Sequence, residues 1–201
     1  MMFDEWLPAA MSVGGYLLGS IPFGLVVAKC LGTVDPRTAG SRNIGFTNVL
    51  RLSGKTAGLL TLAGDMGKGW LVAWTAAQTF DREAVVAAIA LTPIVGHLYS
   101  VFLGFKGGKG VATAMGAVVG MAPLVGVVIM LIWLVTVAVW RYSSGAALVA
   151  FGMLPIVAAV LGGSWVLVLV SVVVSILIVV RHRENLVRLW SGTEPKIWDF
   201  S

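Results

Sequence analysis

The sequence predicts an all-α, polytopic integral membrane protein with seven transmembrane helices, some of them short. Of its 201 residues, 58% are hydrophobic and only 11% are charged, whereas a soluble domain carries about a quarter charged residues. Several apolar stretches approach the roughly 20 residues that a helix needs to cross a bilayer. Most basic residues lie in every second connection between these apolar stretches. We expect residues 1–201 to form a single membrane-embedded domain.

The seven expected spans follow one another with short polar connections. Pro22 predicts a kink in the first span. The fourth and fifth spans come from one apolar run that is too long for an upright helix. Pro123 predicts a break after Met121, because the residue before a proline disfavours the helical conformation. In chain order, the expected spans are Leu7–Lys29, Ala57–Phe80, Ala84–Leu103, Val111–Met121, Pro123–Trp140, Ala146–Leu161 and Trp165–Val180.

The basic residues predict the orientation of these spans. With the N-terminus outside, Arg82 is the basic residue left on the outer side, and the others lie in or near segments that face inside. This positive-inside asymmetry predicts a cytoplasmic C-terminus. The net charge of +5 is then what the topology requires. Since no DNA- or RNA-binding module is visible, we expect no nucleic-acid partner.

A glycine- and lysine-rich loop follows the third span. Its run is Phe105-Lys106-Gly107-Gly108-Lys109-Gly110, and His97 lies just before it. Glycine exposes backbone N–H groups, and the two lysines add charge, which favours an anion site over a loop that only fixes topology. The loop lacks the G-x-x-x-x-G-K-[ST] spacing of a nucleotide-binding P-loop. His97 fits equally well a functional histidine or a satisfied interfacial one.

A second polar segment, residues 40–51, lies between the first two spans on the same side. Ser41 or Asn43 could cap the helix that begins here, and a helix N-terminus presents free N–H groups to an anion. The segment holds more polar groups than a cap requires, so we favour a functional interpretation over an ordinary capped loop. These groups are Ser41, Arg42, Asn43, Thr47, Asn48 and Arg51.

A third polar segment, residues 181–196, follows the last span. In one continuous helix Arg181, Asn185 and Arg188 share a face, and so do His182 and Asn185, so these side chains can converge on one ligand. The alternative is a juxtamembrane basic helix that binds anionic lipid head groups. From this segment alone, the lipid interpretation is slightly preferred.

Smaller features have structural alternatives. Asp65 and Lys68 lie three residues apart within a span, where an internal ion pair is as plausible as direct catalysis. Ser143 and Ser144 stand at a helix start, where capping is the default interpretation. The two histidines lie far apart and no carboxylate cluster is visible, so we expect no metal and no cofactor. Small-residue pairs indicate helix packing: Gly15/Gly19, Gly54/Gly58 and Gly116/Gly120.

Taken together, the chain carries three ordered motifs. They are Gly40-Ser41-x-Asn43-x-Gly45-x-Thr47-Asn48, Gly96-His97-x5-Leu103-x-Phe105-Lys106-Gly107-Gly108-Lys109-Gly110 and Arg181-His182-x2-Asn185-x2-Arg188-Leu189-x2-Gly192-x-Glu194. The chain resembles the small bacterial acylphosphate-dependent glycerol-3-phosphate acyltransferases over essentially its whole length. The resemblance implies a multi-pass enzyme of the bacterial inner (cytoplasmic) membrane with its active site on the cytoplasmic side.

The implied reaction moves a fatty acyl group from acyl-phosphate to the 1-hydroxyl of sn-glycerol 3-phosphate. The products are lysophosphatidic acid and phosphate, in the first step of phospholipid synthesis. The implied donor is neither acyl-CoA nor acyl carrier protein, and the His-x4-Asp signature of acyl-CoA-type acyltransferases is absent. Expected partners are acyl-phosphate, glycerol 3-phosphate and membrane lipids, and we expect a monomer.

The resemblance also implies roles for individual residues. We expect Ser41, Lys106, His182 and Asn185 to act in catalysis. The remaining motif residues, with Ser144 from the turn before the sixth span, are expected to bind substrate in three phosphate clamps. These are Asn43, Asn48 and Arg51; Gly107, Gly108, Lys109 and Gly110; Arg188; and His97.

Catalysis would rest on positioning and charge stabilisation. No Ser-His-Asp arrangement is visible, so we do not expect an acyl-enzyme. His182, His97 or a substrate phosphate oxygen could accept the hydroxyl proton, and we favour the phosphate oxygen. Two positions depart from the family pattern. Arg42 replaces a usual glycine and either tightens or crowds the first clamp, whereas Ser100 replaces a common proline and predicts a more flexible start of the loop.

Two other classes of protein compete with this interpretation. A transporter of a phosphorylated solute is disfavoured because the polar motifs lie at one membrane face rather than at the midplane in broken helices. A structural lipid-binding scaffold would not need so many glycines at its charged sites. The acyltransferase interpretation therefore stands ahead of both.

Overall fold

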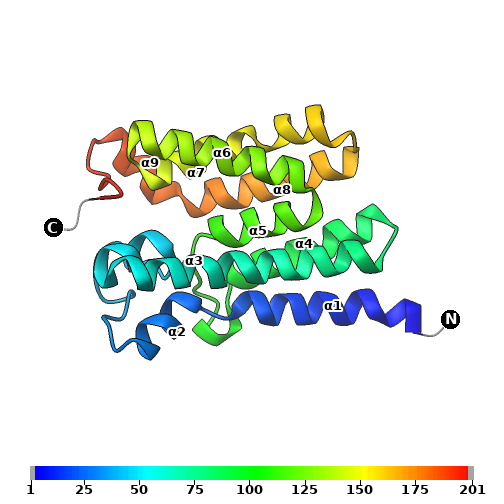
Figure 1. Ribbon diagram of the computed structural model, residues 1–201, viewed down its shortest axis with the longest axis horizontal. Coiled ribbons are helices and arrows are strands. Elements are labelled where there is room, and N and C mark those ends of the chain that lie inside the picture. Colours follow the sequence, from blue (N-terminus) through cyan, green and yellow to red (C-terminus); the bar gives the residue numbers. More distant parts are fainter. Residues whose placement is uncertain (1–2, 199–201) are drawn as a thin grey trace. The chain divides into compact units, whose positions relative to one another are not determined.

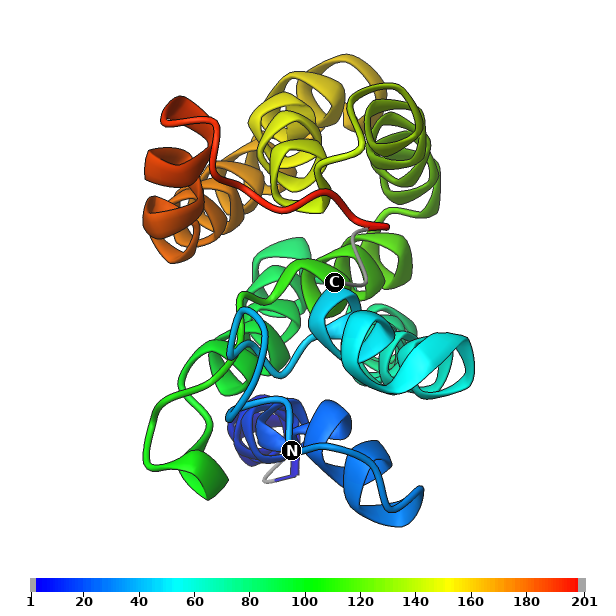
Figure 2. The ribbon, with the colours of Figure 1, turned by 90° about the vertical axis from the view of Figure 1, so that its left-hand side faces the viewer.

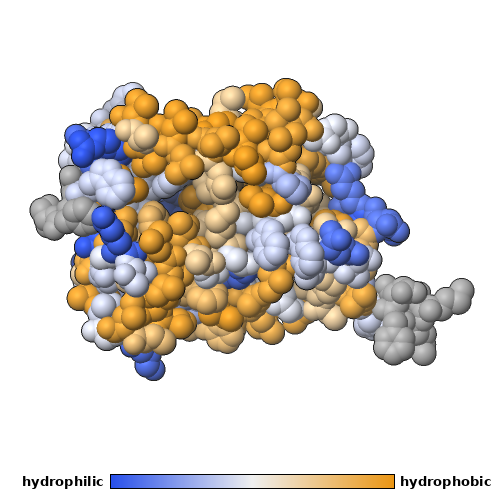
Figure 3. Space-filling model, in the orientation of Figure 1, coloured by the Kyte–Doolittle hydropathy of each residue, from blue (hydrophilic) through white to orange (hydrophobic). Residues whose placement is uncertain are grey.

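The computed structural model describes residues 3–198, with side chains from residue 6 onward, and every regular element in this range is helical (Figure 1). The predicted all-α class is confirmed for these residues. The chain divides into two compact units, residues 1–123 and 124–201. The helices of each unit are seen largely end-on in Figure 2, and much of the face drawn in Figure 3 is hydrophobic.

The described elements alternate with short connections. In the first unit they are α1 (Phe3–Ser20), α2 (Phe23–Cys30), α3 (Phe46–Thr79), α4 (Glu83–Leu98), the 3-10 turn η1 (Val101–Leu103) and α5 (Val111–Met121). In the second unit they are α6 (Pro123–Trp140), α7 (Ser143–Val157), the π-helical turn η2 (Ala158–Gly162), α8 (Trp165–Arg181) and α9 (Arg183–Trp190).

Helix breaks occur largely where proline or glycine predicts them. The first expected span is divided at Pro22 into α1 and α2, which are bent by 46°. The break between Met121 and Pro123 is confirmed. The helix α3 begins before the second expected span, at Phe46, but Gly54 interrupts it with φ 82°, and the expected span lies after this break. Among the described residues, three helices are long and apolar enough to cross a membrane, or up to five if each bent pair is one span.

Glycines allow the helices of the first unit to approach closely. The main packing pairs are α3 with α5 and α1 with α4. A Cβ added to Gly19 would lie 2.3 Å from the Pro93 carbonyl oxygen, and one added to Gly116 would lie 2.0 Å from the Met66 oxygen. The packing roles of the first and third glycine pairs are therefore confirmed. In the second pair the prediction holds for Gly58, where a Cβ would lie 2.9 Å from the Leu50 Cβ, and is wrong for Gly54, which meets nothing within 4 Å and serves as a break.

In two helices a hydroxyl donates to the carbonyl that a proline leaves without its usual partner. Proline lacks an N–H and cannot bond the oxygen four residues earlier. In the second unit Pro155 lies inside α7, and the Ser175 hydroxyl of α8 donates to the Phe151 oxygen at 2.6 Å. In the first unit Pro93 lies inside α4, and the Thr92 hydroxyl donates to the Ile89 oxygen at 2.7 Å.

The Ser175→Ala variant should lower the stability of the protein by about 0.6–1 kcal/mol, because it leaves the Phe151 oxygen without this donor. In a Pro155→Ala background the cost should shrink, since the alanine N–H can bond the same oxygen. Thermal unfolding of the wild type, both single variants and the double variant in one detergent measures the coupling. If Ser175→Ala lowers stability equally in the wild-type and Pro155→Ala backgrounds, Ser175 does not replace the hydrogen bond that Pro155 removes.

Candidate functional site

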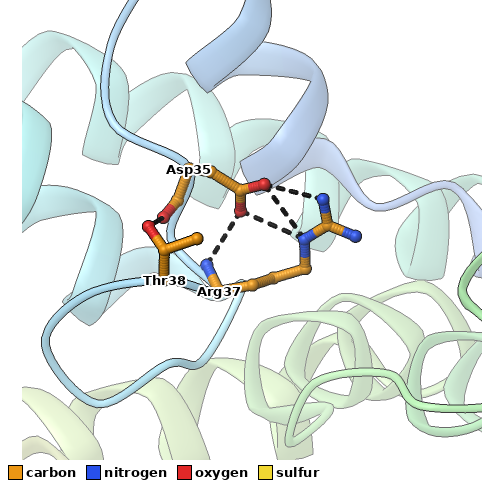
Figure 4. Close-up of polar contacts among 3 residues, drawn as sticks. All are labelled: Asp35, Arg37 and Thr38. Atoms are coloured by element: carbon orange, nitrogen blue, oxygen red, sulfur yellow. Dashed lines mark hydrogen bonds and ion pairs between the residues drawn. The ribbon is translucent and has the colours of Figure 1, made fainter.

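The loop that precedes the first motif is a tight, ion-paired turn (Figure 4). The Asp35 carboxylate accepts a hydrogen bond from the Arg37 backbone N–H at 2.9 Å and pairs with its guanidinium at 2.6 Å. Thr38 donates its hydroxyl proton to the Asp35 carbonyl oxygen at 2.9 Å. The side-chain hydrogen bond from Arg37 is the main reason that the pKa of Asp35 lies below its ordinary value. The turn thus fixes the start of the first motif.

Asn48 holds the first motif in shape. Its Oδ1 accepts from the Ser41 N–H at 2.9 Å, and its Nδ2 donates to the carbonyl oxygens of Pro36 and Asn43, each at 2.9 Å. Only 2% of Asn48 is exposed. The expected caps are wrong: Gly45 stands at the N-cap of α3, which has no side-chain cap bond. Asn48, the third residue of α3, instead folds the loop back onto the helix start.

Arg42 lies in this loop with a left-handed backbone, at φ 55°. Glycine adopts that conformation without a steric penalty, whereas another residue incurs roughly 1–2 kcal/mol. This accounts for the glycine that the family resemblance leads us to expect here. The Arg42 side chain is exposed.

The lysine-glycine loop uses backbone N–H groups to cover the end of α4. The N–H of Gly107 donates to the Leu98 oxygen and that of Gly108 to the His97 oxygen, each at 3.1 Å. A Cβ at Gly107 would lie 1.9 Å from the His97 oxygen. The expectation that these two glycines leave bare N–H groups for an anion is therefore wrong. They are needed for close backbone approach, because the carbonyls at a helix end require partners.

The groups of this loop that remain suited to an anion are its lysines. Lys106 is exposed and Lys109 is half-buried. Gly110 follows in a left-handed conformation, at φ 81°, and is the N-cap of α5. A helix N-terminus attracts negative charge. The two lysines and the start of α5 therefore place three groups that favour an anion along one short stretch of chain.

Ser100 anchors the start of the loop. Only 1% of Ser100 is exposed, and its hydroxyl donates to the Ser20 carbonyl oxygen at 2.6 Å. Its own carbonyl oxygen accepts from the Phe105 N–H at 2.8 Å. The expectation of a more flexible start was wrong, because the hydroxyl makes a buried bond that a proline cannot make.

The first two motifs meet within the first unit through Ile44. A Cβ at Gly108 would lie 3.2 Å from the Ile44 side chain, and one at Gly24 of α2 would lie 1.9 Å from the Ile44 oxygen. Ile44 is only 4% exposed. The loop of residues 99–110 and the polar segment of residues 40–51 therefore pack together.

Asp65, Lys68 and His97 form a buried cluster beneath this loop. The ammonium of Lys68 and a carboxylate oxygen of Asp65 are 2.8 Å apart, which confirms the internal ion pair. The Nδ1 atom of His97 is 3.0 Å from the same ammonium. His97 itself is 4% exposed. The structure thus places His97 among buried partners.

The third motif does not lie on one continuous helix. The chain bends by 61° at His182, between α8 and α9, so the expected shared face of Arg181 and Asn185 is wrong. His182 is 2% exposed, and its Nδ1 lies 2.8 Å from the Ile178 oxygen. A carbonyl can only accept, so Nδ1 carries the proton and Nε2 is the basic nitrogen of the neutral ring.

Glu194 gathers the polar residues of the second unit. Its Oε1 accepts from the Ser144 hydroxyl at 2.5 Å and from Asn185 at 2.6 Å, and its Oε2 pairs with Arg188 at 2.7 Å. Ser144 is therefore not a cap, and Tyr142 holds that position. The sequence analysis includes Glu194 in the third motif but gives it no role, although an acidic residue within a basic motif is a visible signal.

The charge of Glu194 is stabilised by these partners. Burial raises the pKa of the carboxyl group, but the hydrogen bonds from Ser144, Arg188 and Asn185 more than offset it. The net result is a pKa below the ordinary 4.5. The glutamate therefore remains ionised at neutral pH.

Helical composition, apolar surfaces and buried polar clusters define this chain as a membrane-embedded protein with basic, glycine-rich loops. Residues 9–192 match the sequence model of the glycerol-3-phosphate acyltransferases, and the chain belongs to that family and is an acyltransferase. It is 47% identical to the glycerol-3-phosphate acyltransferase of Geotalea daltonii, over 90% of this chain and 93% of that one. The corresponding enzyme of Methylobacillus flagellatus is 46% identical, over 92% and 95% of the two chains.

Two solved structures of a glycerol 3-phosphate acyltransferase are also similar to this chain. The chain is similar to PlsY (YgiH), described as an integral membrane glycerol 3-phosphate acyltransferase, in its glycerol 3-phosphate form. The TM-score is 0.89 and the identity is 41%, with 94% of each chain covered. The lysophosphatidic acid form of PlsY matches with a TM-score of 0.87 at the same identity and coverage.

The stability of the protein should fall on acidification below about pH 4.5, and the Glu194→Gln variant should weaken that dependence. A lowered folded-state pKa gives stability that is present above the unfolded pKa and lost as the pH falls through the folded one. Thermal unfolding in detergent between pH 6 and about pH 3 measures both curves. Parallel curves for the two proteins would contradict this account of Glu194.

Proposed function

We propose that this acyltransferase moves a fatty acyl group from acyl-phosphate to the 1-hydroxyl of sn-glycerol 3-phosphate, giving lysophosphatidic acid and phosphate. One observation carries the proposal: the lysine-glycine loop packs against the polar first motif through Ile44. Cationic and hydrogen-bonding groups are thereby brought together beside apolar helices, as an anionic substrate and a fatty-chain substrate both require. The two ligand forms of PlsY support the same choice of substrate and product.

The chemistry would proceed by direct transfer. The 1-hydroxyl oxygen attacks the acyl carbonyl carbon, the bond from that carbon to the phosphate oxygen breaks, and the hydroxyl proton passes to a phosphate oxygen. Lys106 and Lys109 would stabilise the negative charge that develops on the carbonyl oxygen and the departing phosphate. Ser41 and His182 would assist catalysis by orienting the reacting groups.

Other motif residues would bind the substrates. We assign Asn43 and Arg51 to the first phosphate clamp, Gly110 to the second, and Ser144 and Arg188 to the third. Asn185 belongs to the third clamp as well and would act in catalysis. For Asn48 the contacts with Ser41, Pro36 and Asn43 support a loop-holding role. Gly107 and Gly108 would act in the same way, by letting the backbone approach α4.

The topology proposal follows the basic residues. We place seven spans in the bacterial inner membrane, with the N-terminus outside and the motifs and C-terminus in the cytoplasm. The match of residues 9–192 to one family runs through both compact units, which supports a single functional domain. We propose that it works as a monomer.

The Lys106→Ala and Lys109→Ala variants should each lower kcat by about 100- to 1,000-fold, because each removes a donor that stabilises transition-state charge. The assay uses purified protein with palmitoyl-phosphate and radiolabelled glycerol 3-phosphate, and it measures lysophosphatidic acid. Lys29→Ala is the matched control: Lys29 is an exposed lysine at the end of α2, outside the motifs.

The same assay separates acyl transfer from its competitor. We expect the wild-type protein to form lysophosphatidic acid with palmitoyl-phosphate and none with palmitoyl-CoA. Product from palmitoyl-CoA alone would overturn the proposed donor. Counterflow of a phosphorylated solute in proteoliposomes, without any lysophosphatidic acid, would favour a transporter.

Substrate-assisted proton transfer predicts that the His182→Ala variant retains measurable turnover, with a fall in kcat smaller than the roughly 100- to 10,000-fold contribution of a general base. Calorimetry with glycerol 3-phosphate checks that the variant still binds substrate. A collapse of kcat to background with binding intact would instead identify His182 as the base.

A further inference from the structure

We propose that Lys68 is a positioning residue for the lysine-glycine loop, and that it acts through Asp65 and His97. The proposal rests on the proposed function, because it assigns the loop to the reaction. None of these three residues needs to touch substrate. Together they join α3, the end of α4 and the break between α1 and α2, and so fix where the loop begins.

The Lys68 ammonium has three acceptors within hydrogen-bonding distance. They are the Ile21 carbonyl oxygen at 2.8 Å, the Asp65 carboxylate at 2.8 Å and His97 Nδ1 at 3.0 Å. The contacts with Ile21 and His97 are hydrogen bonds, whereas the contact with Asp65 is an ion pair, because Asp65 Oδ1 has no hydrogen-bond partner of suitable geometry among the described residues. The Phe23 ring of α2 lies 5.6 Å from the same nitrogen. Only 1% of the Lys68 side chain is exposed.

His97 transmits this arrangement to the loop. His97 Nδ1 lies 3.0 Å from the Lys68 ammonium, which can only donate, and 3.4 Å from Asp65 Oδ1, which can only accept. The shorter contact makes Nδ1 the acceptor, and the neutral ring then carries its proton on Nε2. A Cβ at Gly108 would lie 2.4 Å from that Nε2 atom. The His97 carbonyl oxygen also accepts the Gly108 N–H at 3.1 Å. A change in the position of His97 would therefore displace Gly108, the residue just before Lys109.

The break between α1 and α2 supplies the backbone carbonyls to which this cluster is attached. Ile21 lies between the two helices, and its carbonyl oxygen accepts from Lys68. The preceding oxygen, that of Ser20, accepts from the Ser100 hydroxyl at the start of the loop. Two adjacent carbonyls at the α1–α2 break thus hold the end of α4. The Ile21 oxygen is linked to His97 through Lys68, and the Ser20 oxygen is bonded directly by Ser100.

The burial of the cluster argues for positioning rather than direct catalysis. Asp65, Lys68 and His97 are 2%, 3% and 4% exposed. The Lys68 ammonium already has hydrogen bonds with Ile21 and His97 and an ion pair with Asp65, so binding a substrate oxygen would disturb these contacts. A charged pair in an apolar interior needs a reason to be kept, since its burial is costly. Fixing three segments at once supplies that reason.

The test uses full-length protein in detergent and the double variant Asp65→Asn/Lys68→Met. Removing both charges avoids leaving one unpaired, so this variant is expected to fold. Hydrogen exchange by mass spectrometry of a peptide spanning residues 99–110 follows the amides of Gly107 and Gly108. We expect at least a ten-fold faster exchange there, with unchanged exchange in α7 and α8. We also expect at least a ten-fold rise in KM for glycerol 3-phosphate.

Thr61→Val is the matched control. Thr61 lies on α3, is fully buried, and donates its hydroxyl proton only within its own helix, to the Ala57 oxygen at 2.8 Å. This variant should leave loop exchange and KM at their wild-type values. Wild-type loop exchange in the folded double variant would overturn the positioning role, whether or not the protein transfers acyl groups.

Two variants of His97 separate positioning from proton transfer. His97→Asn keeps an acceptor near the position of Nδ1 but has no basic nitrogen, whereas His97→Leu has neither. Positioning predicts that the asparagine variant restores protected loop exchange and retains kcat within about ten-fold of wild type, smaller than a general-base contribution, while the leucine variant does not. If the asparagine variant protects the loop yet has no turnover, His97 is catalytic and the proposal fails.

Discussion

The structure depends on one constraint: in apolar surroundings, each polar backbone group needs a partner within the protein. At several helix breaks and prolines, that partner comes from a side chain. Lys68 and Ser100 bond the two carbonyls at the α1–α2 break, and Thr92 and Ser175 bond oxygens that lie four residues before a proline. These four polar side chains are thus explained by the irregular backbone that they complete.

The same constraint shapes the lysine-glycine loop. Its glycines bring the backbone close enough for two amides to bond the oxygens of His97 and Leu98 at the end of α4. The loop is therefore first a cap of that helix, and its N–H groups are not a general anion cradle. We therefore assign the proposed anion binding to the lysine side chains and to the start of α5. Within the loop, Gly107 and Gly108 thus supply the backbone attachment to α4, and the neighbouring Lys106 and Lys109 supply the cationic side chains.

Much of the fold could be predicted because hydropathy and proline act locally. The break after Met121 and the packing of Gly19 and Gly116 follow from residues that are adjacent in sequence or in one helix. The bend at His182 could not be predicted, because the helical spacing of polar residues continues across it. The partnership of Ser144 with Glu194 was also hidden, since it joins residues 50 positions apart. Ser100 was misjudged because its acceptor lies on α1.

Glu194 shows how an acidic residue can serve a basic motif. Its carboxylate binds Ser144 and Asn185 through one oxygen and the Nε of Arg188 through the other. Bonding through Nε fixes the plane of the guanidinium while leaving its two terminal nitrogens outside this ion pair. Arg188 is also partly exposed, with 34% of its side chain accessible. The glutamate therefore orders three hydrogen-bonding side chains from α7 and α9, and it orients the guanidinium for which we propose a role in phosphate binding.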